Sequence, residues 1–81
     1  MRHIQELTRY LKPTDIAAVA MTRIGSPIET TLPLDKACLL AIEADQNGQY
    51  LSVNIHVEPF GFVTIPEAKI LLENWKGTDN A

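Results

Sequence analysis

The dipeptide Asn47-Gly48 divides a stretch of alternating apolar and polar residues, and it constrains the fold more than any other feature of the sequence. Both central residues of a type I′ turn have positive φ, which asparagine and glycine tolerate best. With the turn at this dipeptide, the register runs outward to the pair formed by Cys38 and Val57. The sequence therefore predicts an antiparallel hairpin over residues 38–57.

This register also separates the side chains of the hairpin by polarity. A shift of one residue would mix the two sets, so the turn and the alternation support the same register. The apolar face would hold Cys38, Leu40, Ile42, Ala44, Leu51, Val53, Ile55 and Val57. The other face would hold Leu39, Ala41, Glu43, Asp45, Tyr50, Ser52, Asn54 and His56. The alternative for the first half is a helix over residues 36–45 capped by Asp35, but the strand at 50–57 would then lack its natural partner.

Two amphipathic helices flank this region. Residues 3–11 place leucine and isoleucine at helical spacing, and Lys12-Pro13 ends the pattern. Residues 65–76 form the clearest helix, with Pro66 at its first position and Gly77 as its terminator. The buried stripe of this helix would be Ala68, Leu71, Leu72 and Trp75. Ile70 lies off that stripe.

Residues 14–32 are ambiguous between two structures. The alanine-rich segment 14–24 favours a helix that begins at Thr14 or Asp15 and ends at Gly25. A pair of strands is the alternative, with Gly25-Ser26 as the turn and Val19 opposite Leu32. The helix is preferred for 14–24, and the fold class does not depend on the choice.

These elements predict a small α+β protein, in which the antiparallel hairpin at 38–57 is packed by an N-terminal and a C-terminal helix. A chain of 81 residues is expected to form one domain, here residues 1–77, with residues 78–81 as a frayed C-terminal tail. The apolar fraction of 46% is ordinary for a globular chain, which argues against disorder throughout.

Charge is distributed unevenly along the chain. Residues 1–23 carry four cations against two carboxylates, whereas residues 24–81 carry three lysines against eight carboxylates. An acidic body repels phosphate, so nucleic acid is not expected as a partner. The chain has no run of 18 apolar residues and no apolar leader after its first methionine, and its single cysteine excludes an internal disulfide. These features predict a cytoplasmic protein with no membrane partner.

The residues that could carry chemistry do not form a known catalytic pattern. In the predicted hairpin, Cys38 points into the core while His56 points to the opposite face, so the sheet separates thiol from imidazole. Ser52 and His56 share a face but are four residues apart on one strand, about 13 Å. Metal-binding spacings such as HxxxH and CxxC are absent, and the glycines are isolated. We therefore expect no catalytic, cofactor or metal site, and no enzyme.

The outer face of the hairpin and the segment that follows are the candidates for partner binding. Phe60 and Phe62 flank a glycine, and either both rings fill the core or one is exposed as a contact. The residues proposed to bind a partner are Tyr50, Ser52, Asn54, His56, Phe60, Phe62 and Ile70. The predicted function is a small acidic protein-binding module, an adaptor, inhibitor or regulator of a larger protein, which also forms a homodimer if sheet edges pair.

Two other functions are left open by the sequence. Two helices before a hairpin resemble the order of elements in a winged helix-turn-helix, which implies a DNA-binding regulator. The second helix would present only one arginine, and the wing at 45–49 would carry no cation. The other alternative is a small enzyme subunit with no recognisable catalytic motif.

Overall fold

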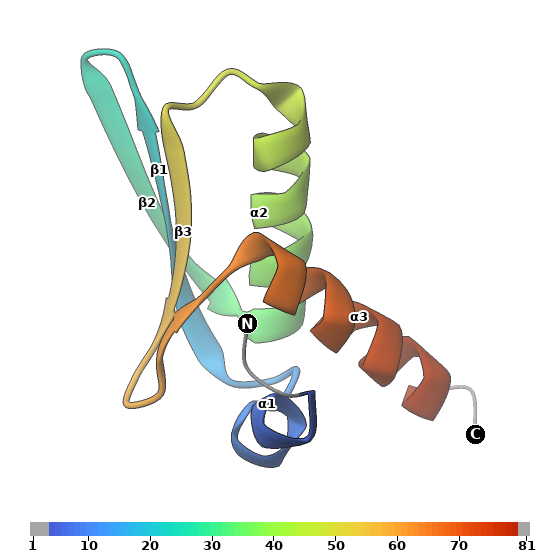
Figure 1. The fold of residues 1–81 in the computed structure, drawn as a ribbon. Coiled ribbons are helices and arrows are strands. Elements are labelled where there is room, and N and C mark those ends of the chain that lie inside the picture. The colour runs from blue at the N-terminus through green and yellow to red at the C-terminus, as the bar shows by residue number, and fades with distance from the viewer. Residues whose placement is uncertain (1–3, 80–81) are drawn as a thin grey trace.

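The computed structural model of the chain describes residues 4–79, and it shows a four-stranded antiparallel sheet with three helices (Figure 1). The predicted α+β class is confirmed. In chain order the elements are α1 (Ile4–Tyr10), β1 (Ile16–Arg23), β2 (Ser26–Pro33), α2 (Leu34–Asn47), β3 (Ser52–Val57), β4 (Gly61–Val63) and α3 (Ile65–Asp79).

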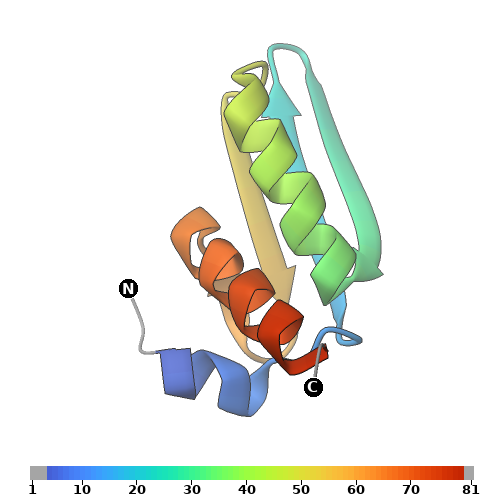
Figure 2. The ribbon, with the colours of Figure 1, turned by 90° about the vertical axis from the view of Figure 1, so that its right-hand side faces the viewer.

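The strands lie in the order β2-β1-β3-β4, so β1 and β3 are central and β2 and β4 form the edges. Both long helices, α2 and α3, lie on the same side of the sheet (Figures 1 and 2). The short helix α1 lies beside α3 at the end of the sheet where β1 begins. The described chain is therefore a two-layer structure, and one face of the sheet has no helix over it.

Residues 16–23 form strand β1 rather than the helix preferred from the alanine content. Burial alternates along the strand, and Ala17, Val19 and Met21 face the core. The alternative of two antiparallel strands was correct, but it placed the turn one residue too late. The loop is Ile24-Gly25, in which Gly25 has φ 77°, as the second central position of a type II turn requires.

The register of this hairpin follows from that loop. Val19 pairs with Thr30, not with Leu32 as the later turn would give. Alanine favours a helix by only a few tenths of a kcal/mol per residue. Burying alternate residues of β1 under the helices contributes more than that preference, because each apolar side chain removed from water is worth about 1–3 kcal/mol.

The predicted hairpin at 38–57 is wrong, because its first half is helix α2. The buried residues of α2 recur at helical spacing: Leu34, Ala37, Cys38, Ala41 and Ala44. Pro33, not Asp35, occupies the cap position of this helix. Gly48 has a φ of 70° and forms the left-handed C-cap. Positive φ at Gly48 was thus foreseen correctly, but it ends a helix instead of turning a hairpin.

Strand β3 finds its partner in β1 instead. The two strands are antiparallel, with Val19 opposite Ile55 and Ala18 opposite His56. On its other side β3 pairs with the three-residue strand β4, where Val63 lies opposite Ile55. The objection that a helix at 36–45 would leave this strand unpaired therefore fails.

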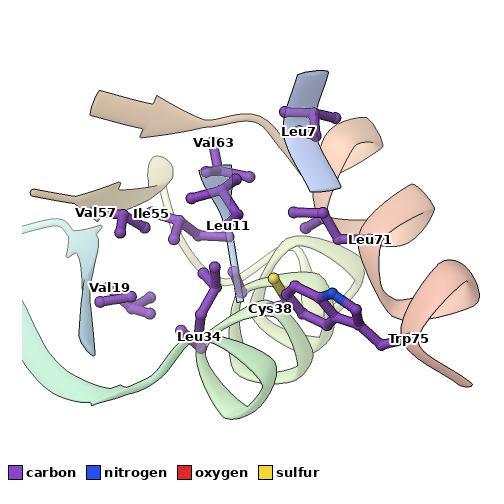
Figure 3. Close-up of a cluster of buried hydrophobic side chains, with 14 of the residues drawn as sticks. Leu7, Leu11, Val19, Leu34, Cys38, Ile55, Val57, Val63, Leu71 and Trp75 are labelled. Carbon is purple, nitrogen blue, oxygen red and sulfur yellow. The ribbon is translucent and has the colours of Figure 1, made fainter. Parts of the chain in front are cut away.

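The core lies between the sheet and the helices (Figure 3). A row of side chains crosses the sheet from Val19 through Ile55 to Val63, and all three are buried. The helices cover this row with Leu7 of α1, Leu34 and Cys38 of α2, and Leu71 and Trp75 of α3. Leu11, just after α1, is also buried, as its helical spacing predicted.

Helix α3 begins with a reciprocal pair of hydrogen bonds. The backbone N–H of Thr64 donates to Glu67 Oε1 at 2.9 Å, and the backbone N–H of Glu67 donates to Thr64 Oγ1 at 3.3 Å. This is a capping box, and it places Pro66 at the second helical position rather than the first. The helix was predicted to end at Gly77 but continues to Asp79. Residues 80 and 81 of the expected tail lie outside the described part.

Candidate functional site

The face of the sheet that no helix within residues 4–79 covers is the candidate site, and we call it the open face. Its side chains form three rows across the strands, because residues opposite one another point to the same side. The first row is Thr31, Ala18, His56 and Phe62. The second is Glu29, Ala20 and Asn54, and the third is Pro27, Thr22 and Ser52.

The middle of the open face carries small side chains, and one of its ends is apolar. Ala18 and Ala20 occupy its centre. At the end where β1 begins, Ile16 and Phe62 are each 63% exposed, which is high for large apolar side chains. The Phe62 ring lies against the imidazole of His56, with ring centroids 5.0 Å apart. The open face therefore offers a small-residue floor with an apolar and aromatic end.

Four of the seven residues predicted to bind a partner lie together on this face: Ser52, Asn54, His56 and Phe62. Phe62 is the exposed ring of the FGF segment. Phe60 is half-buried at the edge of the core, and its ring centroid lies 6.4 Å from that of Tyr10. The expectation that both rings fill the core is wrong, and the alternative of one exposed ring is correct.

The other two predicted contacts lie elsewhere. Tyr50 precedes β3 and packs against the core, with the guanidinium carbon of Arg23 5.7 Å from its ring centroid. The chain bends at Leu51, so the alternation that begins at Ser52 does not extend back to Tyr50. For the same reason Leu51, predicted to be in the core, is 70% exposed. Ile70 is half-buried on α3, the helix that lies on the same side of the sheet as α2.

A hollow of about 470 Å³ adjoins the aromatic end of the open face. Its volume is within the range of small-molecule sites, about 300–1,000 Å³. Tyr10 and Phe60 contribute aromatic walls, and His56, Asp15 and Glu58 contribute polar groups. His56 Nδ1 lies 3.8 Å from Glu58 Oε1. The Asp15 carboxylate accepts a hydrogen bond of 2.9 Å from the backbone N–H of Lys12.

The sequence interpretation missed the residues that β1 contributes to this site. Ile16, Ala18 and Ala20 fall in the segment for which a helix is preferred, and a helix there gives no reason to place them beside the polar residues of 52–56. The strand alternative for this segment, with its turn near Gly25, was the interpretation that could have placed them on the sheet. Tyr10 was also missed, because its contact with Phe60 joins segments far apart in the sequence.

Cys38 is fully buried in α2, so its expected role in the core is confirmed, although it lies on a helix. Burial, reinforced by the negative charge of Asp35, raises the pKa of the Cys38 thiol to about 12. The thiol lies on the helical side of the sheet, and His56 lies on the open face. Thiol and imidazole are thus on opposite sides, as predicted.

We expect Cys38 of the folded protein to resist thiol reagents. With a pKa near 12, only about one thiol in ten thousand is ionised at pH 8, and the thiolate is the reactive form. The measurement is the rate of reaction with an aromatic disulfide reagent at pH 8. The same protein in concentrated urea is the control and should react within seconds to minutes. Equal rates in buffer and in urea would contradict the burial of this residue.

Within residues 4–79, no group of three or more histidine, cysteine, aspartate or glutamate side chains is arranged to hold a metal ion. None of the helices described is long and apolar enough to cross a membrane. The DNA-binding hypothesis relied on a helix at 14–24, and residues 16–23 of that segment form β1. Comparison of the chain with models of protein families, with curated proteins and with solved structures gave no match.

Proposed function

We propose that this chain is a small protein-binding module, an adaptor, inhibitor or regulator of a larger protein, and that it binds through the open face of its sheet. The observation that carries the proposal is the position of α2 and α3 on one side of the sheet, which leaves the other side uncovered (Figure 2). An antiparallel sheet is stable with one face in water, so this face is available to a partner.

The shape of the open face favours a macromolecular partner. The small side chains of Ala18 and Ala20 make a floor that another flat surface can approach closely. Ile16 and Phe62 stand at one end, and exposed aromatic side chains are typical anchors of protein interfaces. Contact at this end would remove both apolar side chains from water.

The charge of the open face favours a basic contact surface on the partner. Its three rows contain Glu29 but neither lysine nor arginine, and the adjoining hollow adds Asp15 and Glu58. Opposite charges steer association and select the partner. An arginine side chain suits the hollow, since its guanidinium can pair with the carboxylates and stack on the rings of Tyr10 or Phe60.

The test compares open-face variants with a variant on the helical side. Tagged protein is used to capture its partner from the native cell, and the amount of that partner is measured. Ala20→Arg adds a bulky cation to the floor, and Phe62→Ala removes the exposed ring, so each should reduce capture about tenfold or more. Leu39→Ala is the matched control, because Leu39 is 51% exposed on α2.

All three variants should keep the melting temperature of the parent protein within a few degrees. Captured partner should also be released by moderate salt, because charge contributes to the contact. If Ala20→Arg and Phe62→Ala capture as much partner as the parent, or if Leu39→Ala loses it equally, the open face is not the binding surface.

A further inference from the structure

Along edge strand β2, the backbone N–H and C=O groups of alternate residues face β1 and the free edge of the sheet. One hydrogen bond just beyond the strand shows which residues of β2 bond to β1 and which face the free edge. The N–H of Leu34 donates to the carbonyl of Asp15 at 2.6 Å, and this pair continues the ladder one step past Ile16 and Pro33. Counting from this bonded pair, every second residue of β2 bonds to β1. These residues are Leu32, Thr30, Ile28 and Ser26.

The other residues of β2 direct their backbone groups to the free edge of the sheet. A second hydrogen bond supports this phase: the N–H of Leu51 donates to the carbonyl of Thr22 at 2.6 Å, so Thr22 faces β3 and its partner Pro27 faces outward. The outward residues are Pro27, Glu29, Thr31 and Pro33.

Proline occupies the first and last of these four outward positions. Proline has no N–H, so the outer edge of β2 presents the amide donors of Glu29 and Thr31 alone. No other strand within residues 4–79 pairs with this edge. A strand docking here therefore finds two donors in the middle and none at either end, which limits the pairing to a short segment in a defined register.

A second copy of β2 fits that segment when it runs antiparallel. With Glu29 opposite Thr31 of the second copy, both N–H groups and both carbonyls of these residues form hydrogen bonds, four in total by symmetry. Thr30 then faces its own copy, and Ile28 faces Leu32 of the other chain, which are favourable cross-strand pairs. Pro27 faces Pro33, so no outward N–H group of either chain lies opposite a proline.

Other registers are worse. A shift of two residues in one direction places Glu29 opposite Glu29 of the second copy, and like charges directly opposite one another are destabilising. A shift in the other direction places Glu29 opposite Pro33, the cap residue of α2, whose carbonyl already accepts the first hydrogen bond of that helix. In the register centred on Thr30, Glu29 and Thr31 pair only with each other, so the glutamates stay apart and no bond depends on the carbonyl of Pro33.

We propose that a second copy of this chain pairs with the outer edge of β2 through residues 27–33, in the register that is centred on Thr30. The two sheets then join into one antiparallel sheet of eight strands, with the twofold axis perpendicular to it. This axis places both open faces on the same side and all helices on the other. The proposal does not depend on the proposed function, because the pairing uses backbone groups at the edge of β2, whereas the open face would bind a partner through side chains.

The first test is the molar mass in solution by light scattering across a range of concentrations. The parent protein should show twice the mass of one chain, and Thr31→Pro should show one chain, because the substitution removes an outward N–H. Thr31→Val is the matched control and should stay dimeric. Circular dichroism checks the fold, and the natural prolines at the equivalent positions 27 and 33 indicate that the edge tolerates this residue.

The second test is cross-linking under mild oxidation, which applies even if Thr31→Pro fails to fold. Thr30→Cys should form a covalent dimer readily, because the two cysteines would face each other at the axis. Ile28→Cys should not, because it would face Leu32 of the other chain. A parent protein that stays monomeric at every concentration, or equal cross-linking at 28 and 30, would overturn the proposal. Because the Thr31 side chain also lies on the open face, partner capture by Thr31→Pro is compared with capture by Thr31→Val. Equal capture by a monomeric Thr31→Pro and a dimeric Thr31→Val would leave the proposed function standing.

Discussion

Replacement of Leu34 by alanine is expected to leave much of the protein unfolded at room temperature. Leu34 is fully buried at the start of α2, and truncation of a buried leucine costs about 2–5 kcal/mol. As a single chain, a domain of this size has a free energy of unfolding of only about 3–5 kcal/mol, so the comparison is made at protein concentrations at which the chain is monomeric. The measurement is urea denaturation followed by circular dichroism, and the midpoint should fall close to zero denaturant.

Leu51→Ala is the matched control for this substitution, since it removes the same atoms from a side chain that is 70% exposed. Its expected effect is within about 0.5 kcal/mol. The comparison also separates the two folds, because the hairpin predicted from the alternation would bury Leu51. Equal destabilisation by the two substitutions would contradict the structure described above.

The second large effect is expected at the start of α3. Glu67 is 2% exposed, and its carboxylate accepts the hydrogen bond from the backbone N–H of Thr64. Glu67→Ala removes that acceptor in a partly buried setting and should lower the free energy of unfolding by about 1–3 kcal/mol. Urea denaturation at neutral pH measures this change.

Two further variants show whether the capping box is the cause. Glu67→Gln keeps a side-chain oxygen at the same place, and glutamine is accepted in this motif, so it should retain most of the stability. Glu73→Ala removes an exposed carboxylate from the same helix and should change stability by no more than about 0.5 kcal/mol. If Glu67→Gln is as unstable as Glu67→Ala, the hydrogen bond to Thr64 is not the main contribution of this residue.

The two terminal helices were predictable because the apolar spacing and the prolines in their sequences are compatible with a helix and not with a strand. Residues 65–76 combine helical spacing of apolar residues with proline near the start, and residues 3–11 end before a proline. Residues 38–47 carry signals with two interpretations, because Cys38, Leu40, Ile42 and Ala44 alternate while Leu34, Ala37, Ala41 and Ala44 recur at helical spacing. Gly48 adopts positive φ in either structure, so its presence in the dipeptide Asn47-Gly48 could not decide between hairpin and helix.

Part of the candidate site was predictable because it depends only on the alternation of side chains along one strand. Ser52, Asn54 and His56 share a face in any strand that includes them, whichever strand lies beside them, so this part of the prediction survived an error in the pairing. The neighbours on β1 could not be found this way, because they depend on which strand pairs with β3. That choice is made by the packing of α2 across the sheet, which local patterns do not record.

The position of β3 between β1 and β4 has a consequence for the order of folding. The β1–β2 hairpin closes over two residues, whereas the pairing of β1 with β3 closes a loop that contains all of β2 and α2. The entropy lost on closure grows with loop length, so the local hairpin can form early while the centre of the sheet waits for the intervening chain to collapse. The pair of strands at the middle of the finished sheet is thus expected to be among the last to join, and its formation is the step that should govern the folding rate.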